Sequence, residues 1–499
     1  MTAGLNDIRD VVRGAIASFF GFGGRLIARA LLMVIAGRAF GVEPLGVLGQ
    51  VAAITEISAA IGVVGLKRGL LDLLSADEIA GRSLEARIVE ALSISAIFSI
   101  GIAITAAVIW RLIFPGHISL APFFLIAAPA IVFTDVALTA VKHKRIIGWD
   151  VWSRGIAEPW SFLALAVIFL NLNMRDNGLV TAYVGSTVFA ALFAGAGLLR
   201  TYGFMALVRS RPHPRRWFYL VKKSAPVGVT DVGVMALRRV DLVVLSLFAS
   251  ADIVGLYYMV QQLASIPQKT YALFEPMLSP VIARLHNKLD TKKIKANLIG
   301  VCRWVFIVQL AISIPMMVFG DDLLSLFGDA FTAGGVVLAT ILIAELIDGS
   351  FLATETPLVF AKPKLPPFLL VATIIIEVIA IAALSQLWGA EGAAIGFLVA
   401  IVSLNASRLI LTAKHLEIRV INTSFIMPAF LAIMIAAVTL AVRHIANIEN
   451  GIVISLLFVG CICVFLALVR WFALTKSDRI LFRVFMQRRR RERSKTVLA

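Results

Sequence analysis

Residues 24–50 read GRLIARALLMVIAGRAFGVEPLGVLGQ. The apolar run LIARALLMVIAG has the character of a membrane-crossing helix, yet Arg25 and Arg29 lie in and beside it, one helical turn apart. An arginine near the middle of a bilayer costs at least about 2.5 kcal/mol. No acidic residue lies three or four positions from either arginine, so their counter-charge must come from another helix, from water or from a ligand.

The rest of the chain has the same apolar character. Of its 499 residues, 60% are hydrophobic and only 15% are charged, whereas soluble domains carry about 25% charged residues. Apolar segments of about 20 residues recur, each long enough to cross a hydrocarbon core of about 30 Å. We therefore predict an all-α polytopic membrane protein of fourteen transmembrane helices. The predicted spans are 14–36, 45–66, 88–110, 120–141, 155–173, 178–199, 224–249, 253–274, 298–319, 334–360, 366–385, 390–413, 422–442 and 451–474.

The net charge of +17 is explained by topology. An even number of spans places both termini on one side, and the loops of that side hold most of the 47 Lys and Arg residues. The opposite loops hold only Arg38, Arg111, Arg175 and Arg443. Cytoplasmic loops carry the excess of Lys and Arg, so both termini are predicted to be cytoplasmic, with the chain in the cytoplasmic (inner) membrane. A nucleic-acid partner is not needed to explain the charge.

The predicted basic tail, 476–499, contains the run QRRRRERSK at 487–495. It is expected to rest on anionic lipid at the membrane surface. Cys302, Cys461 and Cys463 fall in apolar spans, and the six histidines fall in loops or at span ends. We therefore expect no disulfide framework, no metal site and no cofactor.

The chain also repeats itself. Shifting residues 24–51 by 209 positions pairs Gly24 with Gly233, Arg29 with Arg238 and Gly46 with Gly255, at the starts of predicted spans 1 and 7. An even span offset keeps both copies in the same orientation, which predicts two six-helix lobes related by a pseudo-twofold axis along the membrane normal. The predicted parts are an N-lobe (1–205), a cytoplasmic linker (206–223), a C-lobe (224–415), two extra spans (416–475) and the tail.

Arg29 and Arg238 lie at equivalent depths in this repeat. Arg29 lies 11 residues before Phe40, and Arg238 lies 11 residues before Ala249, the points where the two helices exit outward. This separation corresponds to roughly 16 Å, about half of the bilayer core. Guanidinium groups bind phosphate in bidentate fashion and keep their charge at physiological pH. We therefore predict a hydrated cavity between the lobes that holds an anionic group with Arg25, Arg29, Arg238 and Arg239.

Several acidic residues also fall within the predicted spans. On span 7, Asp231, Arg238 and Asp241 share one stripe, so Asp241 is a possible partner of Arg238. The acidic residues either pair with cations between helices, or bind a proton or Na⁺ and couple transport to an ion gradient. The candidates for coupling are Glu56, Asp135, Asp231, Asp241, Glu345 and Asp348.

The sequence resembles the polysaccharide-flippase (Wzx-type) branch of the multidrug/oligosaccharidyl-lipid/polysaccharide exporter superfamily. The resemblance covers most of residues 15–415 and is carried by the order and spacing of several stretches. They are the opening segment, RRVDLVVLSLFASADIVGLYYMVQQLASIP (238–267), FEPMLSPVIARL (274–285), FGDDLLSLFGDAF (319–331) and WGAEGAAIGF (388–397).

The resemblance implies a two-lobe transporter that works by alternating access and is not an enzyme. Its implied cargo is an undecaprenyl-diphosphate-linked oligosaccharide, flipped from the cytoplasmic to the outer leaflet for surface-polysaccharide assembly. A polysaccharide polymerase and export proteins are the implied partners, and a cation gradient is the implied energy source. The chain contains no GxxxxGK[ST] nucleotide-binding motif.

Three alternatives remain open. The lipid II flippase of the same superfamily also has fourteen spans and cationic cavity residues. A multidrug extruder fits less well, because cationic drugs favour acidic sites. A membrane-embedded polymerase or glycosyltransferase needs a sizeable outward loop, whereas the longest one here, residues 320–333, has no His, Arg or Lys.

Overall fold

The computed structural model describes residues 23–113, 120–210, 212, 217–288, 290–446 and 450–474. Across these residues the chain is helical almost throughout and forms no strand. Ten helices are long and apolar enough to cross a membrane. The prediction of an all-α, multi-pass membrane protein is confirmed. The predicted tail, 476–499, and the beginning of the predicted span 14–36 lie outside the described residues.

The number of spans, fourteen, stays a prediction. One candidate span, Leu365–Leu416, covers the two predicted spans 366–385 and 390–413 and bends at Trp388 and Gly389, where φ of the glycine is +52°. The prediction of one uninterrupted helix over 224–249 was wrong. The first helix there ends at Leu237 and the next begins at Val240.

Contacts divide the chain into two compact units. Unit 1 comprises Met1–Gln261, Leu324–Val337 and Pro367–Ala400, and unit 2 comprises Gln262–Leu323, Leu338–Pro366 and Ile401–Ala499. None of the boundaries between the units falls in the predicted linker 206–223, so the division into lobes at that linker stays a prediction.

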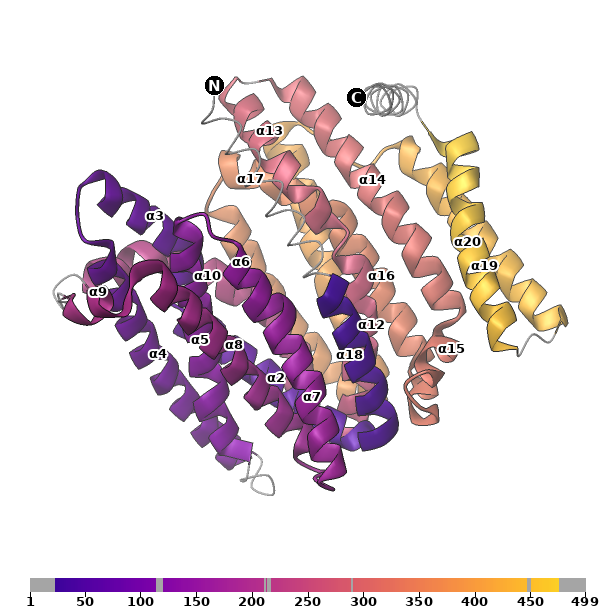
Figure 1. The fold of residues 1–499 in the computed structure, drawn as a ribbon. Helices are drawn as coiled ribbons and strands as arrows, with labels where there is room; N and C mark the ends of the chain where they lie inside the picture. The colour runs from indigo at the N-terminus through magenta and orange to yellow at the C-terminus, as the bar shows by residue number, and fades with distance from the viewer. Residues whose placement is uncertain are drawn as a thin grey trace, which may run out of the picture. The chain divides into compact units, whose positions relative to one another are not determined.

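The first part of the chain builds most of unit 1 (Figure 1). Helix 23–35 continues into a π-helical segment, η1, and is followed by eleven further elements before residue 251. In order, the elements are η1 (Ala36–Phe40), α2 (Val42–Gly62), α3 (Leu66–Ile79), α4 (Leu84–Ile113), α5 (Ala121–His143), α6 (Gly148–Asp150), the π-helical η3 (Val151–Ala157), α7 (Glu158–Asn171), α8 (Gly178–Tyr202), α9 (Phe204–Arg209), α10 (Trp217–Leu237) and α11 (Val240–Phe248).

The remaining helices belong to unit 2 or contain a boundary between the units, except η6, which belongs to unit 1. They are α12 (Ala251–Gln268), η5 (Tyr271–Leu273), α13 (Glu275–Asn287), α14 (Thr291–Val318), α15 (Gly320–Ser325), η6 (Asp329–Gly334), α16 (Gly335–Phe351), η7 (Leu352–Thr354), α17 (Glu355–Ala361), α18 (Leu365–Leu416), η8 (Thr423–Phe425), α19 (Ile426–Ala446), α20 (Gly451–Leu468) and η9 (Val469–Ala473). In unit 2, α14 packs against α19 and α20 around a core that includes Ile307, Ala432 and Phe465.

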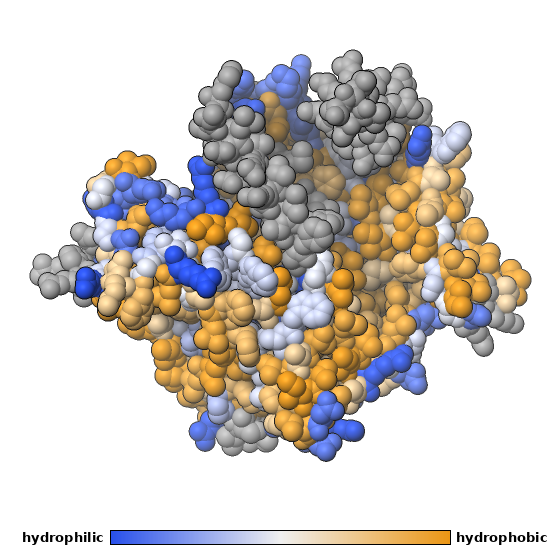
Figure 2. Space-filling model, viewed as in Figure 1, coloured by the Kyte–Doolittle hydropathy of each residue, from blue (hydrophilic) through white to orange (hydrophobic). Residues whose placement is uncertain are grey.

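Within unit 1, α5 packs between α4 and α8, and α8 also packs against α7. Leu70, Ile88 and Val136 are completely buried in this core. Large apolar side chains on the outer faces of the same helices, such as Ile97 and Ile104, are exposed, as expected where lipid tails replace water. Figure 2 shows apolar side chains along these helices and hydrophilic ones gathered at the end where α3 and α9 lie.

The repeat-related glycines Gly46 and Gly255 lie in direct contact where α2 meets α12. A Cβ atom on Gly46 would lie 1.8 Å from the Ala251 carbonyl oxygen and 2.9 Å from the Gly255 nitrogen. A Cβ atom on Gly255 would lie 2.0 Å from the Val42 carbonyl oxygen. Equivalent residues meet in this way beside a twofold axis, and small residues permit such close helix approach in membranes.

Replacing Gly46 by alanine is expected to lower the free energy of unfolding by about 1–3 kcal/mol, because overpacking forces the two backbones apart. The thermal midpoint of the purified protein in detergent measures this change. Gly101→Ala on α4 is the matched control, since no atom lies within 4 Å of its added Cβ. Equal midpoints for the two variants would show that the crossing tolerates a methyl group.

Candidate functional site

A cavity of about 460 Å³ lies within unit 1. It is lined by side chains from helix 23–35, α2, α3, α5, η3, α7, α8, α10, the 238–239 break and α12. Six basic and four acidic residues line it, which leaves a surplus of two positive charges. The basic residues are Arg25, Arg29, Lys67, Arg68, Arg154 and Arg239, and the acidic ones are Glu56, Asp135, Glu158 and Asp231.

The structure brings together part of the predicted site. The predicted residues that line the cavity are Arg25, Arg29, Arg239, Glu56, Asp135 and Asp231. Arg238 and Asp241 lie at the break between α10 and α11, next to the cavity residue Arg239. Glu345 and Asp348 belong to α16 in unit 2 and do not line this cavity.

Helix irregularities position several of these cations. The chain leaves the helical path at Arg238 and Arg239, and Arg154 lies in the π-helical segment η3. Non-helical backbone at membrane depth is tolerated where it is buried in protein or lines a cavity, and π segments are frequent at functional sites. Because span 7 is broken, Asp231, Arg238 and Asp241 do not form the single stripe expected from the sequence.

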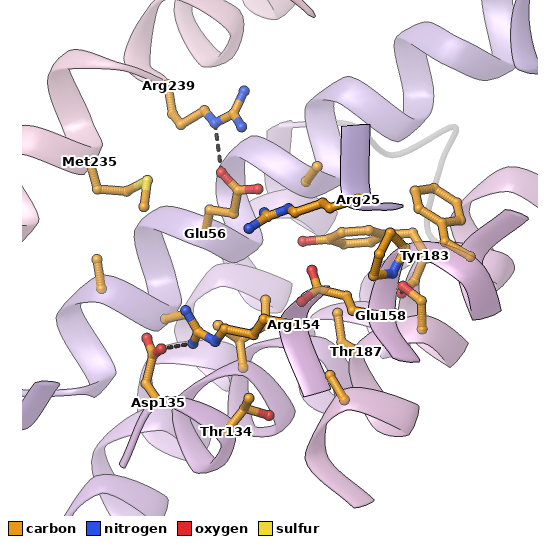
Figure 3. Close-up of a pocket in the computed structure, with 18 of the residues that line it drawn as sticks. Arg25, Glu56, Thr134, Asp135, Arg154, Glu158, Tyr183, Thr187, Met235 and Arg239 are labelled. Carbon is orange, nitrogen blue, oxygen red and sulfur yellow. Dashed lines mark hydrogen bonds and ion pairs between the residues drawn. The ribbon is translucent and has the colours of Figure 1, made fainter. Parts of the chain in front are cut away.

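Arg239 belongs to a chain of polar contacts at the break. Its Nε donates to Glu56 Oε2 over 2.6 Å, and its guanidinium also donates to Gln261 Oε1 over 3.2 Å. Gln261 Nε2 donates to Asp241 Oδ2 over 2.8 Å, and the Tyr257 hydroxyl donates to the same oxygen over 2.9 Å. Arg239 is therefore neutralised by Glu56 (Figure 3) rather than left as a free cation.

Arg25 is one of the exposed cations of the cavity, with Lys67 and Arg68. It makes no ion pair with any residue that the structure describes. Figure 3 shows its side chain extending into the cavity between Glu56 and Glu158. Glu158 also faces Arg154, so its charge is shared between two arginines. Arg25 is the side chain best placed to meet an incoming anion.

Sequence reasoning missed the cations at the other end of the cavity. Arg154 pairs with Asp135 (Figure 3), Lys67 Nζ lies 3.7 Å from Asp135 Oδ2, and Arg68 Nε lies 3.2 Å from Asp231 Oδ1. The predicted spans ended at residue 66 and began again at 155, which assigned these cations to cytoplasmic loops. The helical stretches Val42–Ile79 and Gly148–Asn171 instead carry them along the cavity wall.

Glu377 is a second residue that sequence reasoning missed. It lies on α18 in unit 1, is completely buried, and neither carboxylate oxygen has a hydrogen-bond partner among the described residues. Asp241 and Arg238 are charged groups that act electrostatically on Glu377. The signal was present in the sequence, because Glu377 is the one acidic residue in the apolar run LPPFLLVATIIIEVIAIAAL.

Asp348 in unit 2 is held by cationic and amide donors. Its Oδ1 accepts from Arg408 over 3.1 Å and from Asn405 over 3.2 Å, and Arg408 also pairs with Glu355. All of Asp348, Asn405 and Arg408 are buried. Glu345 Oε1 accepts from Gln268 over 3.2 Å. Of the two roles expected for the acidic residues, this geometry favours pairing between helices for Asp348.

Asp348→Asn is accordingly expected to lower the free energy of unfolding by about 1–3 kcal/mol, because Arg408 loses a buried charged partner. The thermal midpoint in detergent checks this, with Glu391→Gln as an exposed acid-to-amide control on α18. The response of transport to an imposed ion gradient should be unchanged. A lost response with an unchanged midpoint would instead assign Asp348 to coupling.

No protein-family model and no curated protein sequence matches the chain. Several solved structures, by contrast, match the fold of the chain. An inward closed conformation of the lipid II flippase MurJ aligns with a TM-score of 0.66 at 14% identity, over 92% of this chain and 99% of that one.

Two other structures extend the likeness. An inward-facing multidrug resistance MATE transporter of the MOP superfamily aligns with a TM-score of 0.63 at 15% identity, over 78% of this chain and 94% of that one. A MOP superfamily transporter from Pyrococcus furiosus, described as having a binding pocket of reverse polarity, aligns with a TM-score of 0.51 at 15% identity, over 82% and 95%. The chain thus has the fold of MOP-superfamily transporters.

Proposed function

We propose that this protein flips a polyprenyl-diphosphate-linked oligosaccharide from the cytoplasmic to the outer leaflet by alternating access, for surface-polysaccharide biosynthesis. The observation that carries the proposal is the cavity in unit 1. It is enclosed by apolar helices, has a surplus of two positive charges, and presents Arg25 without an ion pair among the described residues.

A diphosphate suits this cavity chemically. It carries about two negative charges, which match the surplus on the lining, and arginine binds phosphate oxygens through paired N–H donors. The polyprenyl tail can stay in lipid, where it needs no protein partner, while the charged group crosses inside the protein. The volume of about 460 Å³ lies within the usual range for small-ligand pockets, about 300–1,000 Å³.

The structural neighbours include both a lipid II flippase and a multidrug resistance transporter, so the shared fold does not decide between these cargoes. One is a lipid II flippase, whose cargo is lipid-linked, and another carries a pocket whose polarity is described as reversed. The same fold therefore accommodates pockets of different charge, and the pocket is the better guide to cargo. A positively charged pocket repels cationic drugs, which weighs against the multidrug alternative.

For energy coupling, we favour Asp241 and Glu377. They are buried carboxylates of unit 1 that interact electrostatically, and Glu377 lacks a hydrogen-bond donor among the described residues. Two carboxylates in such a site cannot both stay ionised at low cost, so one takes up a proton or both share a cation. Asp241 also joins the polar chain to Arg239 and Glu56, which links this pair to the cavity.

Orientation and partners complete the proposal. The distribution of Lys and Arg places both termini in the cytoplasm, with the chain in the inner membrane. The basic tail would then lie against anionic lipid, and the flipped cargo would be taken up by a polysaccharide polymerase and export proteins.

Deletion of the gene tests the function directly. A flippase deletion should trap lipid-linked repeat units on the inner leaflet, where they are accessible to lectin only after the membrane is opened. Single repeat units on the cell surface would instead indicate a polymerase or glycosyltransferase. Rescue of a strain depleted of its lipid II flippase, with normal surface polysaccharide in the deletion strain, would favour lipid II as the cargo.

A further inference from the structure

Three basic side chains lie at the α3 end of the cavity and differ in exposure from their partners. The side chains of Lys67, Arg68 and Arg154 keep 48%, 68% and 28% of their surface exposed. The carboxylates that pair with them, Asp135 and Asp231, are only 9% and 15% exposed. An anion outside the pairs can therefore reach the cations, while the carboxylates are shielded.

The charges of this cluster do not balance. Asp135 pairs with both Lys67 and Arg154, and Asp231 pairs with Arg68, so three cations share two carboxylates. Water screens the exposed cation of such a pair, which weakens its attraction to the carboxylate. A phosphate ester with two charges and several acceptor oxygens is therefore a strong competitor for these cations.

The Arg68–Asp231 pair spans a backbone contact between α3 and α10. Gly65, with φ +72°, precedes α3, and a Cβ atom there would lie 2.2 Å from the Ser224 carbonyl oxygen and 2.5 Å from the Gly228 nitrogen. Arg68 lies about one helical turn after Gly65, and Asp231 lies about one helical turn after Gly228. Among the described residues, this is the ion pair that joins α3 to α10.

We propose that Lys67, Arg68 and Arg154 form a second anion site, which accepts a diphosphate before it reaches Arg25 and so loosens α3 from α10. The diphosphate draws Arg68 away from Asp231 because it offers more charge and a bidentate geometry. Without that ion pair, only the packing around Gly65 and Gly228 holds the two helices together. The ligand chemistry is a diphosphate, whether lipid-linked or free.

This inference rests on the proposed function for the identity of the cargo, but diphosphate binding can be measured without transport. The full-length protein is placed in nanodiscs with Cys302, Cys461 and Cys463 replaced by serine and with Gly69→Cys and Ser224→Cys introduced. A Cβ atom on Gly69 lies 3.3 Å from Ser224 Cβ, close to the separation of about 3.5–4.5 Å found in disulfides. The rate of disulfide formation then reports contact between α3 and α10.

Geranylgeranyl diphosphate should slow this cross-linking several-fold, and geranylgeraniol should not. Slowing by the lipid alone assigns the site to a lipid-linked diphosphate, whereas equal slowing by inorganic pyrophosphate shows that the free group suffices. An unchanged rate with both diphosphates would overturn the proposal. Equal slowing by geranylgeraniol would overturn it too, because the effect would then come from the hydrocarbon chain.

Matched arginine variants separate this site from the Arg25 site. Arg68→Gln should abolish the response to diphosphate, whereas Arg25→Ala should retain it. Retention with Arg68→Gln and loss with Arg25→Ala would refute the second site. If the cargo is not a lipid-linked saccharide, the flipping assay fails, but this cross-linking response persists.

Asp231→Asn provides a measurement that does not need the cysteine pair. Because Asp231→Asn releases Arg68, this variant should bind geranylgeranyl diphosphate more tightly. The half-saturating concentration in a thermal-shift titration should fall by about threefold, the range expected when a weak ion pair no longer competes. If the Arg68–Asp231 pair only supports the fold, the variant should bind the diphosphate equally well or more weakly, and that result would overturn the proposal.

Discussion

Replacing Arg25 and Arg29 together by alanine is expected to lower the flipping rate of a lipid-linked diphosphate by at least about a hundredfold. Each hydrogen-bonded contact to a charged group is worth about 1.5–3 kcal/mol, and every 1.4 kcal/mol is tenfold. Both arginines line the cavity, on one face of helix 23–35. Flipping is measured in proteoliposomes as the loss of inner-leaflet protection of a labelled polyprenyl-diphosphate sugar.

Two controls make this result specific. Arg111→Ala removes an exposed arginine from the end of α4, outside the cavity, and should flip at the wild-type rate. Arg25→Lys should recover only part of the activity, because an ammonium group cannot present the paired donors of a guanidinium. Normal flipping by the Arg25/Arg29 double variant would refute the anion-binding role of the cavity.

The fold class could be predicted because membrane helices leave a strong signal in sequence. An apolar run of about 20 residues matches the thickness of the hydrocarbon core, and ten helices have the required length and apolar character. The break at Arg238 and Arg239 could not be predicted in the same way. No proline or glycine marks those two positions, and the local backbone follows from contacts such as the one between Arg239 and Glu56.

The site was predicted in part for a related reason. Arg25 and Arg29 stand out because they interrupt an apolar run, and this exception points to function at membrane depth. Lys67, Arg68 and Arg154 lie where hydropathy places the end of a span, so charge alone assigned them to loops. In the structure the helical stretches Val42–Ile79 and Gly148–Asn171 continue past the predicted span ends, and these side chains therefore line the cavity.

Partners within the membrane were the least predictable feature. Spacing along one helix suggested Asp241 for Arg238, and Arg238 does act electrostatically on Asp241. Asp241 also accepts hydrogen bonds from Tyr257 and Gln261 of α12, which the spacing did not suggest. The electrostatic interaction of Asp241 with Glu377 of α18 joins residues more than a hundred positions apart and depends on packing between helices. A single sequence contains no record of that packing.

Glu377→Gln is expected to abolish the acceleration of flipping by an imposed proton or Na⁺ gradient. The amide has nearly the shape of the carboxyl group but cannot take up or release a proton and has no negative charge to attract a cation. Asp241 then no longer faces a second titratable group in the buried pair. The assay compares flipping in proteoliposomes with and without each gradient, and the two rates should become equal in the variant.

The matched control is Glu391→Gln, the same change on the same helix at an exposed position, which should keep the full response to the gradient. The change at Glu377 should not lower the thermal midpoint, because an uncharged amide costs less to bury than a carboxylate. Loss of coupling with an intact midpoint assigns the role to the carboxyl group itself. A variant that still responds fully to both gradients would exclude Glu377 from coupling and leave the cation to bind elsewhere.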